Sequence, residues 1–233
     1  MKPTTNKAAS VRQRLLNRAR SDKRPFNELL QYYAMERFLY RLSQSFSSDR
    51  FILKGALLLR VWDAPEFRPT MDIDMLGKTS NEEAAILALF NNILLVPVEE
   101  DGLFFDTGSL QSERITEDAD YEGIRIRFKG ALDTARVNMQ IDIGFGDIVF
   151  PKPEEAELPT MLDFPAPKLL CYSRESAIAE KFEAMIKLGF LNSRMKDFLT
   201  YGYYPASSTS QDSIWPNLSD SRLNNERPLF PRR

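Results

Sequence analysis

Residues 68–75 read Arg-Pro-Thr-Met-Asp-Ile-Asp-Met, so two carboxylates stand one residue apart between apolar neighbours. In a β-strand, Asp72 and Asp74 would point to the same side of the sheet and Ile73 to the other. The two like charges would lie about 7 Å apart along the backbone. They repel each other unless a cation lies between them. This stretch therefore predicts a sheet that carries a cation site.

Two further features of the sequence fit such a site. Gly55 follows the apolar run 51–53 at a predicted strand-to-helix turn, where backbone N–H groups can approach a phosphate. Asp142 stands inside a later apolar strand, residues 140–143. Three carboxylates on adjacent strands can hold one or two Mg²⁺ ions, with Mn²⁺ as the alternative. A metal pair of this kind clamps the attacking and leaving oxygens in phosphoryl transfer, so the combination favours nucleotidyl transfer.

Each feature alone has a simpler interpretation. A single Asp-x-Asp on a strand is more often a pair of solvated surface acids. Lys181 lies beside the apolar face of a predicted helix and could reach nucleotide phosphates, but it could equally be a surface lysine whose stem packs on apolar neighbours. Arg194 and Lys196 could form a local ion-pair cluster with Asp197. Only the order of the features along the chain favours a nucleotide site.

The composition excludes several classes of site. The 233 residues include no histidine and one cysteine, Cys171. This excludes Ser-His-Asp and Cys-His catalysis, histidine-bound zinc and an internal disulfide, and it makes a reducing cytoplasm the expected setting. No apolar run approaches the length of a membrane span, so no membrane partner is expected. The net charge of -2 means that a polyanionic partner would need a local patch. The basic segment 1–24 could supply one, although a solvated helix face is the commoner interpretation.

Periodicity predicts helices around a sheet. Helical spacing of apolar residues predicts helices over 8–20, 25–45, 56–62, 81–95 and 173–189, with Pro25 in a first turn and Ser80 and Ser173 as N-caps. Apolar runs and alternation predict strands over 51–53, 68–76, 103–105, 113–115, 124–128 and 137–143. The prolines within 150–168 indicate an ordered connector, and a short helix is expected from Asn192. We therefore predict an α/β (α+β) fold with a mixed β-sheet flanked by helices.

The order of the motifs resembles a known family. Residues 51–60, which open Phe-Ile-Leu-Lys-Gly-Ala, and residues 68–74 resemble the opening motif of the AbiEii/AbiGii-type nucleotidyltransferase toxins, which include the MenT toxins. Residues 180–184 (Glu-Lys-Phe-Glu-Ala) and 192–198 (Asn-Ser-Arg-Met-Lys-Asp-Phe) are similar to its two later motifs. The resemblance covers about residues 25–198. It implies a polymerase-β-like nucleotidyltransferase fold, Mg²⁺ and a nucleoside triphosphate (NTP). It also implies the toxin role of an abortive-infection toxin–antitoxin pair with an antitoxin encoded nearby, and some members modify the 3′ end of tRNA.

The resemblance also implies a role for each matching residue. Asp72, Asp74 and Asp142 would bind metal, and Asp142 could be the base for the attacking hydroxyl. The remaining catalytic candidates are Lys181, which would hold phosphate, and Asp197, and the nucleotide-binding candidates are Lys54, Gly55, Arg68, Thr70 and Arg194. This chain has Thr70 where serine is frequent, which keeps the hydroxyl. It has Ala56 where a second small residue, often glycine, is usual.

After Phe198 the sequence departs from the family pattern. Residues 199–233 are polar, dotted with proline and without helical period, so little core of their own is expected. A one-nucleotide shift of the reading frame from Leu199 allows codons for Asp-Ile-Trp-Leu-Leu-Ser-Arg-Gln-Phe-Asp-Phe, which is close to the helix expected for the family. We therefore hypothesise a frameshifted, truncated product, and early stops in the alternative frame of the coding DNA would contradict this. Such a tail would leave an apolar face of helix 173–189 exposed and lower stability and toxicity.

The predicted organisation has four parts. They are a basic N-terminal arm (1–24), a nucleotidyltransferase core (25–168), a helical C-terminal segment that is truncated (169–198) and an atypical, poorly ordered tail (199–233). The expected function is Mg²⁺-dependent transfer of nucleotides from an NTP to an RNA acceptor. Two alternatives stay open. One is an inactive homologue that only binds a partner such as the antitoxin, and the other is a transferase that modifies protein, as in AMPylation.

Overall fold

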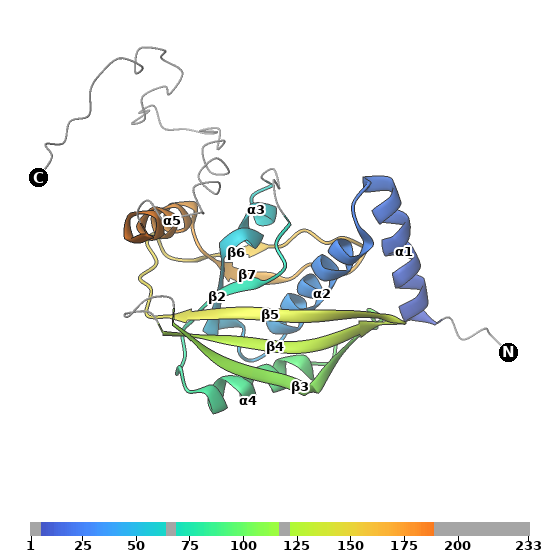
Figure 1. Cartoon of the computed structure of the whole chain (residues 1–233), viewed down its shortest axis with the longest axis horizontal. Helices are drawn as coiled ribbons and strands as arrows, with labels where there is room; N and C mark the ends of the chain where they lie inside the picture. Colours follow the sequence, from blue (N-terminus) through green and yellow to red (C-terminus); the bar gives the residue numbers. More distant parts are fainter. Residues whose placement is uncertain (1–5, 64–68, 117–121, 189–233) are drawn as a thin grey trace, which may run out of the picture. The chain divides into compact units, whose positions relative to one another are not determined.

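The computed structural model describes residues 6–63, 69–116 and 122–188, all within residues 1–202, the first of two units into which the chain divides. Figure 1 shows the elements in chain order. The helices are α1 (Lys7–Asp22), α2 (Phe26–Ser43), α3 (Leu58–Val61), α4 (Glu83–Leu94) and α5 (Arg174–Leu188), with 3₁₀ turns at Ser48–Arg50 and Gly55–Leu57. The strands are β1 (Phe51–Lys54), β2 (Ile73–Gly77), β3 (Leu103–Thr116), β4 (Glu122–Leu132), β5 (Ala135–Phe145), β6 (Glu154–Glu157) and β7 (Lys168–Cys171).

The strands form one mixed sheet in the order β3-β4-β5-β2-β1-β7-β6. Strands β3, β4 and β5 follow one another as an antiparallel meander. β2 then pairs parallel with β5 and antiparallel with β1, and β1 pairs parallel with β7. The predicted mixed sheet flanked by helices is confirmed.

One face of the meander carries the apolar core, because α2 and α4 cover it. Phe38 of α2 stacks on Phe90 of α4 with ring centroids 5.7 Å apart, and it contacts Phe128 of β4 at 5.6 Å. Along β5, Val137, Met139, Ile141 and Ile143 are buried on this side. The intervening polar residues of β5 therefore face the opposite side of the sheet.

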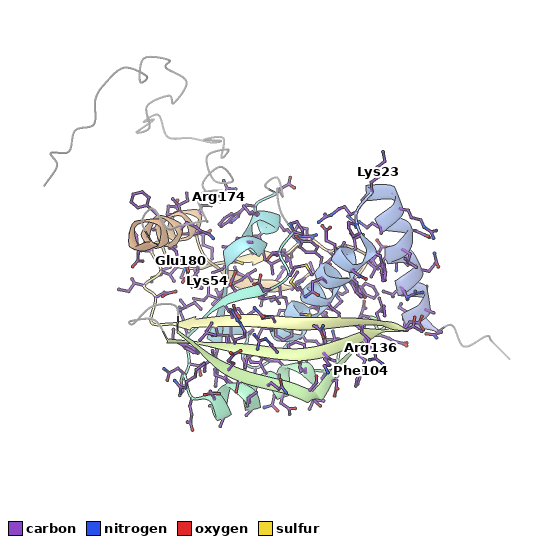
Figure 2. All side chains as sticks on the ribbon, viewed as in Figure 1. Lys23, Lys54, Phe104, Arg136, Arg174 and Glu180 are labelled. Atoms are coloured by element: carbon purple, nitrogen blue, oxygen red, sulfur yellow. The ribbon has the colours of Figure 1, made fainter. Side chains whose placement is uncertain are left out.

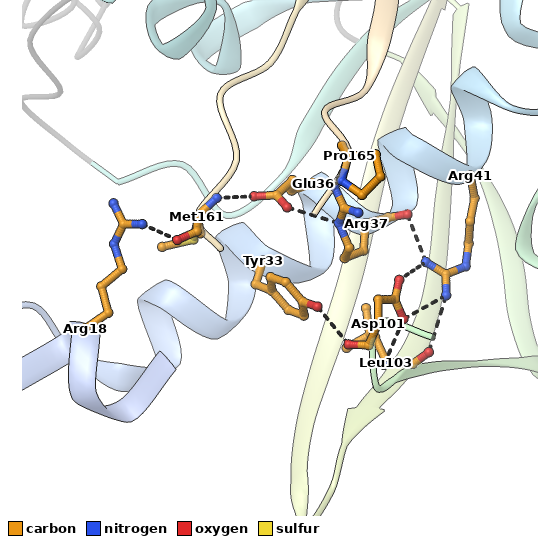
Figure 3. A network of polar contacts seen from close by, with 9 residues as sticks. All are labelled: Arg18, Tyr33, Glu36, Arg37, Arg41, Asp101, Leu103, Met161 and Pro165. Atoms are coloured by element: carbon orange, nitrogen blue, oxygen red, sulfur yellow. Dashed lines mark hydrogen bonds and ion pairs between the residues drawn. The ribbon is translucent and has the colours of Figure 1, made fainter. Parts of the chain in front are cut away.

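Buried polar side chains of α2 fasten the connecting loops to the core (Figure 3). Arg41 forms a two-pronged ion pair with Asp101, at 2.7 and 3.2 Å, at the start of β3. Glu36 accepts a hydrogen bond of 2.6 Å from the backbone N–H of Met161, and Arg37 donates one of 2.6 Å to the carbonyl of Pro165. Because these groups are removed from water, each loop that pairs with them is held in one place.

The basic N-terminal segment packs against the core. Val11 and Leu15 of α1 are fully buried. Arg14 pairs with Asp163 at 2.7 Å, and Arg18 donates to the carbonyl of Met161. These two arginines therefore have acceptors within the protein, and α1 packs with the core rather than standing off it as a separate arm.

The elements predicted within the described residues exist, with several corrections. The strand predicted to begin at residue 68 is β2, which begins only at Ile73. The helix predicted over 56–62 is a 3₁₀ turn followed by one α-turn, and the separate strands at 103–105 and 113–115 are parts of one bulged strand, β3. Ser80 is wrong as the N-cap of α4, because Glu82 occupies that position and Ser80 accepts from its N–H instead. Pro25 is the N-cap of α2 rather than a first-turn residue.

Other predictions at the C-terminal side have mixed outcomes. Ser173 caps α5 as predicted, since its hydroxyl accepts from Ser176 N–H at 3.1 Å. The connector 150–168 contains the short strand β6, which pairs with β7. Periodicity revealed neither of these two strands. The helix from Asn192 and the tail 199–233 lie outside the described residues. No helix in the described part of the chain is long and apolar enough to cross a bilayer.

Candidate active site

Strand register lines up charged residues across the sheet. Lys54 at the end of β1 pairs with Asp74 of β2, and Asp74 pairs with Asp142 of β5. Asp142 in turn pairs with Arg125 of β4, and Arg125 with Glu113 of β3. Directly paired residues on neighbouring strands present their side chains on the same face. The register therefore gives a row of charged side chains in which two neighbouring carboxylates, Asp74 and Asp142, lie between two cations, Lys54 and Arg125.

Gly55 makes room for the central carboxylate of this row. Its φ of +73° is in the left-handed region, and a Cβ at this position would lie 2.0 Å from Asp74 Oδ2. Any other residue would therefore clash with the Asp74 carboxylate as well as strain the backbone. The sequence analysis placed Gly55 at this turn for phosphate contact, which stays a prediction, whereas the structure assigns it the close approach of Asp74.

Asp74 lies in an unfavourable environment for a negative charge. Its pKa is raised from 3.8 to about 7, mainly by burial and also by the nearby carboxylates of Asp72 and Asp142, while Lys54 and Lys181 act in the opposite direction. The three predicted metal ligands and two predicted phosphate-binding lysines therefore lie within electrostatic range of one another. This is the repulsion expected when carboxylates are gathered for a cation.

Asp72 stands immediately before β2, beside Thr70. The Thr70 hydroxyl donates a hydrogen bond of 2.9 Å to Asp72 Oδ1. The backbone N–H of Thr70 donates one of 3.0 Å to the Tyr32 hydroxyl of α2. Thr70 therefore orients Asp72, while its predicted contact with triphosphate stays a prediction.

Arg125 is the principal residue that sequence reasoning missed. It donates to both oxygens of Asp142, from Nε at 2.8 Å and from Nη2 at 2.7 Å. This two-pronged pair fixes the carboxylate in one orientation, and the hydrogen bond raises the pKa of Arg125 above its usual range. The signal in the sequence was the alternating run 124–128, but only the register reveals which acid Arg125 faces.

Lys54 already has carboxylate partners. Its Nζ lies 2.7 Å from Glu180 Oε1 of α5 and 3.0 Å from Asp147 Oδ2, after the end of β5 (Figure 2). The Tyr172 hydroxyl also donates to Asp147, at 3.0 Å. Lys54 therefore holds α5 and the segment after β5 beside the row of charges, and α5 brings Lys181 to Asp74. Glu180 and Asp147 were not among the predicted site residues.

The remaining predicted residues are not placed. Arg68, Arg194 and Asp197 lie outside the described residues. Within residues 6–63, 69–116 and 122–188, no three acidic, cysteine or histidine side chains are already arranged as a metal cage. Asp142 is directed toward Arg125, and among the described residues no two-pronged arginine pair of this kind is formed by Asp72 or Asp74. The metal roles of all three acids stay predictions.

A family model for the nucleotidyl transferase AbiEii toxin of type IV toxin–antitoxin systems matches residues 37–199. The chain belongs to this AbiEii family. The matched span contains β1, Gly55, the acids of β2 and β5, and Lys181, and the predicted family resemblance is confirmed. The AbiEii match ends one residue beyond Phe198, where the sequence analysis placed the departure from the family pattern.

Two solved structures from Helicobacter pylori are similar to this AbiEii-family chain. JHP933 shares 17% identity with a TM-score of 0.38, over 66% of this chain and 55% of its own. A candidate nucleotidyltransferase shares 15% identity with a TM-score of 0.39, over 66% of this chain and 56% of its own. The chain thus spans just over half the length of these structures. No curated protein matches it.

Proposed function

We propose that the protein is a Mg²⁺-dependent nucleotidyltransferase, the toxin of a type IV toxin–antitoxin pair, which transfers a nucleotide from an NTP to an RNA acceptor such as a tRNA 3′ end. The observation that carries the proposal is the register of Lys54, Asp74 and Asp142, together with membership of the AbiEii family. Family membership supplies the reaction class. The register supports the proposal, because it puts Lys54, Asp74 and Asp142 on one face of the sheet.

The donor atoms at the site fit a magnesium ion. Mg²⁺ prefers oxygen ligands and is commonly held by one or two carboxylates together with substrate phosphates and water, rather than by a complete protein cage. Asp72 and Asp74 offer such a pair, and their repulsion favours a cation between them. Bound there, the ion would stabilise negative charge on the triphosphate and lower the pKa of an acceptor hydroxyl.

The side chains of the site lie on two sides of Asp74. Lys54 and Lys181 lie on the β1 and α5 side, where positive charge can attract a triphosphate. Asp142 lies on the β5 side, and Arg125 fixes its orientation. An acceptor hydroxyl that approaches from β5 would meet Asp142 as a hydrogen-bond acceptor, in position to take its proton.

The proposal is tested by label transfer. The purified protein is incubated with each α-³²P-labelled NTP and Mg²⁺, with tRNA, other RNA or total protein as acceptor. We expect label on RNA, and Asp72→Asn should abolish it, because one of the two acids that would hold the ion is lost. Asp49→Asn is the matched control, since Asp49 is an exposed acid in the 3₁₀ turn before β1.

Two outcomes would contradict this function. Label on protein alone would favour the protein-modifying alternative. Full transfer by Asp72→Asn would show that the metal site is wrongly assigned, whatever the acceptor.

A further inference from the structure

A polar face extends away from the proposed active site along β3, β4 and β5. In β5 the side chains of Arg136, Asn138 and Gln140 lie on the same face as Asp142, because alternate residues share a face. The register places Lys129 opposite Asn138, and Arg127 opposite Gln140. This face therefore continues the row that contains Asp142.

The polar face borders a groove that ends at the proposed metal site. Strand β2 begins at Ile73, opposite Ile141, so the earlier residues of β5 pair with β4 alone in the described part of the chain. Gln31 of α2 bridges the gap by donating to the carbonyls of Met71, at 2.9 Å, and Asn138, at 3.1 Å. The resulting groove has a volume of about 610 Å³, and Asp72 forms part of its wall.

The groove wall has the chemistry of a nucleic-acid site. The six side chains that define it here, and that we call the acceptor groove, are Gln111, Arg127, Lys129, Arg136, Asn138 and Gln140. Three of these side chains are cationic, and the other three are amides, which can hydrogen-bond to base edges. In the part of the chain that the structure describes, Asp72 is the only acidic residue in the wall.

Two of the cations are available to an external anion. Arg127 pairs with Glu113 at 2.6 Å. Among the described residues, no ion pair engages Lys129 or Arg136, and both are exposed. Asp106, the register partner of Lys129 on β3, directs its Oδ1 to the N–H of Gly108. The two free cations face one another diagonally across β4 and β5.

An aromatic ring lies in the same row as Arg136. Ala131 of β4 pairs with Arg136 on one side and with Phe104 of β3 on the other. Phe104 is 64% exposed, although its neighbours Leu103 and Phe105 are buried. Figure 2 shows Phe104 and Arg136 close together at this end of the sheet. Exposed aromatic rings among cations are the usual platform for unpaired bases.

We propose that the acceptor groove holds the single-stranded 3′ end of the RNA acceptor, with Lys129 and Arg136 on its phosphates and Phe104 under a base. The inference rests on the proposed function. The terminal hydroxyl would then lie near Asp72 and Asp142, and the strand would follow β5 toward Arg136. The six residue-to-residue steps along β5 from Asp142 to Arg136 span about 20 Å, long enough for several nucleotides. The NTP keeps the opposite side of Asp74, beside Lys54 and Lys181.

The test measures RNA binding rather than transfer. A 5′-fluorescein-labelled single-stranded RNA is titrated with the full chain in EDTA over a series of KCl concentrations. For single strands, log K falls with log salt by about 0.7 for each phosphate contact, so Lys129→Ala with Arg136→Ala should lower the slope by about 1.4. The double variant Lys152→Ala with Lys168→Ala removes two lysines beside the other edge of the sheet and should leave the slope unchanged.

Two single variants separate stacking and misfolding from charge. Phe104→Ala should weaken binding about ten-fold without changing the salt slope, because base stacking carries no charge. Asn138→Arg adds a cation between Lys129 and Arg136 and should raise the slope by about 0.7. A gain of this kind cannot come from misfolding.

An unchanged salt slope in the Lys129 and Arg136 double variant would overturn the proposal. An equal decrease of the slope in the Lys152 and Lys168 control would also overturn it. Binding of an acidic protein, with loss of that binding but not of RNA binding in the groove variants, would also overturn it. If the slopes change as expected but no nucleotide is transferred, RNA binding in the acceptor groove is supported and the proposed function is contradicted. If RNA is labelled but the salt slopes of the groove variants do not change, the proposed function is supported and RNA binding in the acceptor groove is contradicted.

Discussion

At the scale of single residues, the site depends on a few close approaches. Gly55 was predicted from its place between a strand and a helix, but the reason for glycine lies in Asp74, whose carboxylate occupies the space of a side chain. Likewise, Asp142 was predicted from its apolar neighbours, yet its orientation comes from Arg125. In both cases the sequence predicted the residue, and a partner distant along the chain explains its role.

The Gly55 contact can be isolated with a matched pair of variants. Gly55→Ala introduces a Cβ 2.0 Å from Asp74 Oδ2 at a φ of +73°, whereas Gly146→Ala has a φ of +88° and nothing within 4 Å. Both share the cost of left-handed backbone, so urea unfolding should show Gly55→Ala less stable than Gly146→Ala by about 1–3 kcal/mol. Nucleotide transfer should fall only in Gly55→Ala. Equal losses in the two variants would contradict the clash.

Asp74 should make the stability of the metal-free protein depend on pH. Its pKa is about 7 in the folded state, above its value of 3.8 as a model group, so the folded state binds more protons between these values. The free energy of unfolding therefore falls as pH rises from about 4 to 7, by on the order of a few kcal/mol. Asp74→Asn should remove this part of the pH dependence in urea titrations with EDTA. Mg²⁺ at pH 8 should stabilise the wild type but not this variant.

A pH profile of Asp74→Asn that coincides with the wild-type profile would contradict this assignment. Asp49→Asn controls for the loss of one carboxylate, because Asp49 is exposed. It should leave the pH dependence between 4 and 7 as it is in the wild type.

At the scale of elements, the sheet gathers the site and α5 completes it. The central strands β1, β2 and β5 come from separate parts of the chain, and their pairing puts Lys54, Asp74 and Asp142 in line. α5 lies outside the sheet and is held to β1 by the pair between Lys54 and Glu180. The position of Lys181 therefore depends on a contact made by its neighbour in the helix.

Removing the Lys54 charge should loosen α5. Lys54→Met keeps most of the buried stem but removes the ammonium group that pairs with both Asp147 and Glu180. We expect faster amide hydrogen exchange in α5 and in the segment after β5, with little change in β3 and β4. Lys168→Met is the control, because Lys168 makes a similar but exposed pair with Glu157 at 3.0 Å. Uniform faster exchange would indicate general destabilisation instead.

At the scale of the whole molecule, an apolar surface lies beside the site. Ile178 and Phe182 of α5 are 45% and 52% exposed, and Phe150 is 82% exposed. An exposed apolar face is predicted on this helix, and Ile178 and Phe182 confirm it for the described part of α5. The proposed cause, a frameshift after Phe198, concerns residues outside the described ranges and stays a hypothesis for the coding DNA to test.

This surface should lower solubility without contributing to stability. Phe182→Ser should reduce binding of the dye ANS and raise the concentration at which the protein aggregates, while the free energy of unfolding changes by less than about 0.5 kcal/mol. Phe46→Ser is the control, because Phe46 is fully exposed but far along the chain from this group. A large loss of stability in Phe182→Ser would show that the ring packs against other parts of the chain.

The sequence by itself indicated most of the element types and the candidate residues of the site, whose chemical roles stay predictions. A period of two puts Asp72 and Asp74 on one face, and a period of 3.6 reveals α2 and α5, because both patterns are local. The tertiary structure alone decided the register that aligns Lys54, Asp74, Asp142 and Arg125, and the joining of two predicted strands into β3. These depend on pairing between distant segments, since a shift of one residue would turn each side chain to the other face. For the same reason no local pattern could reveal which distant residues Arg125, Glu180 and Phe104 lie beside.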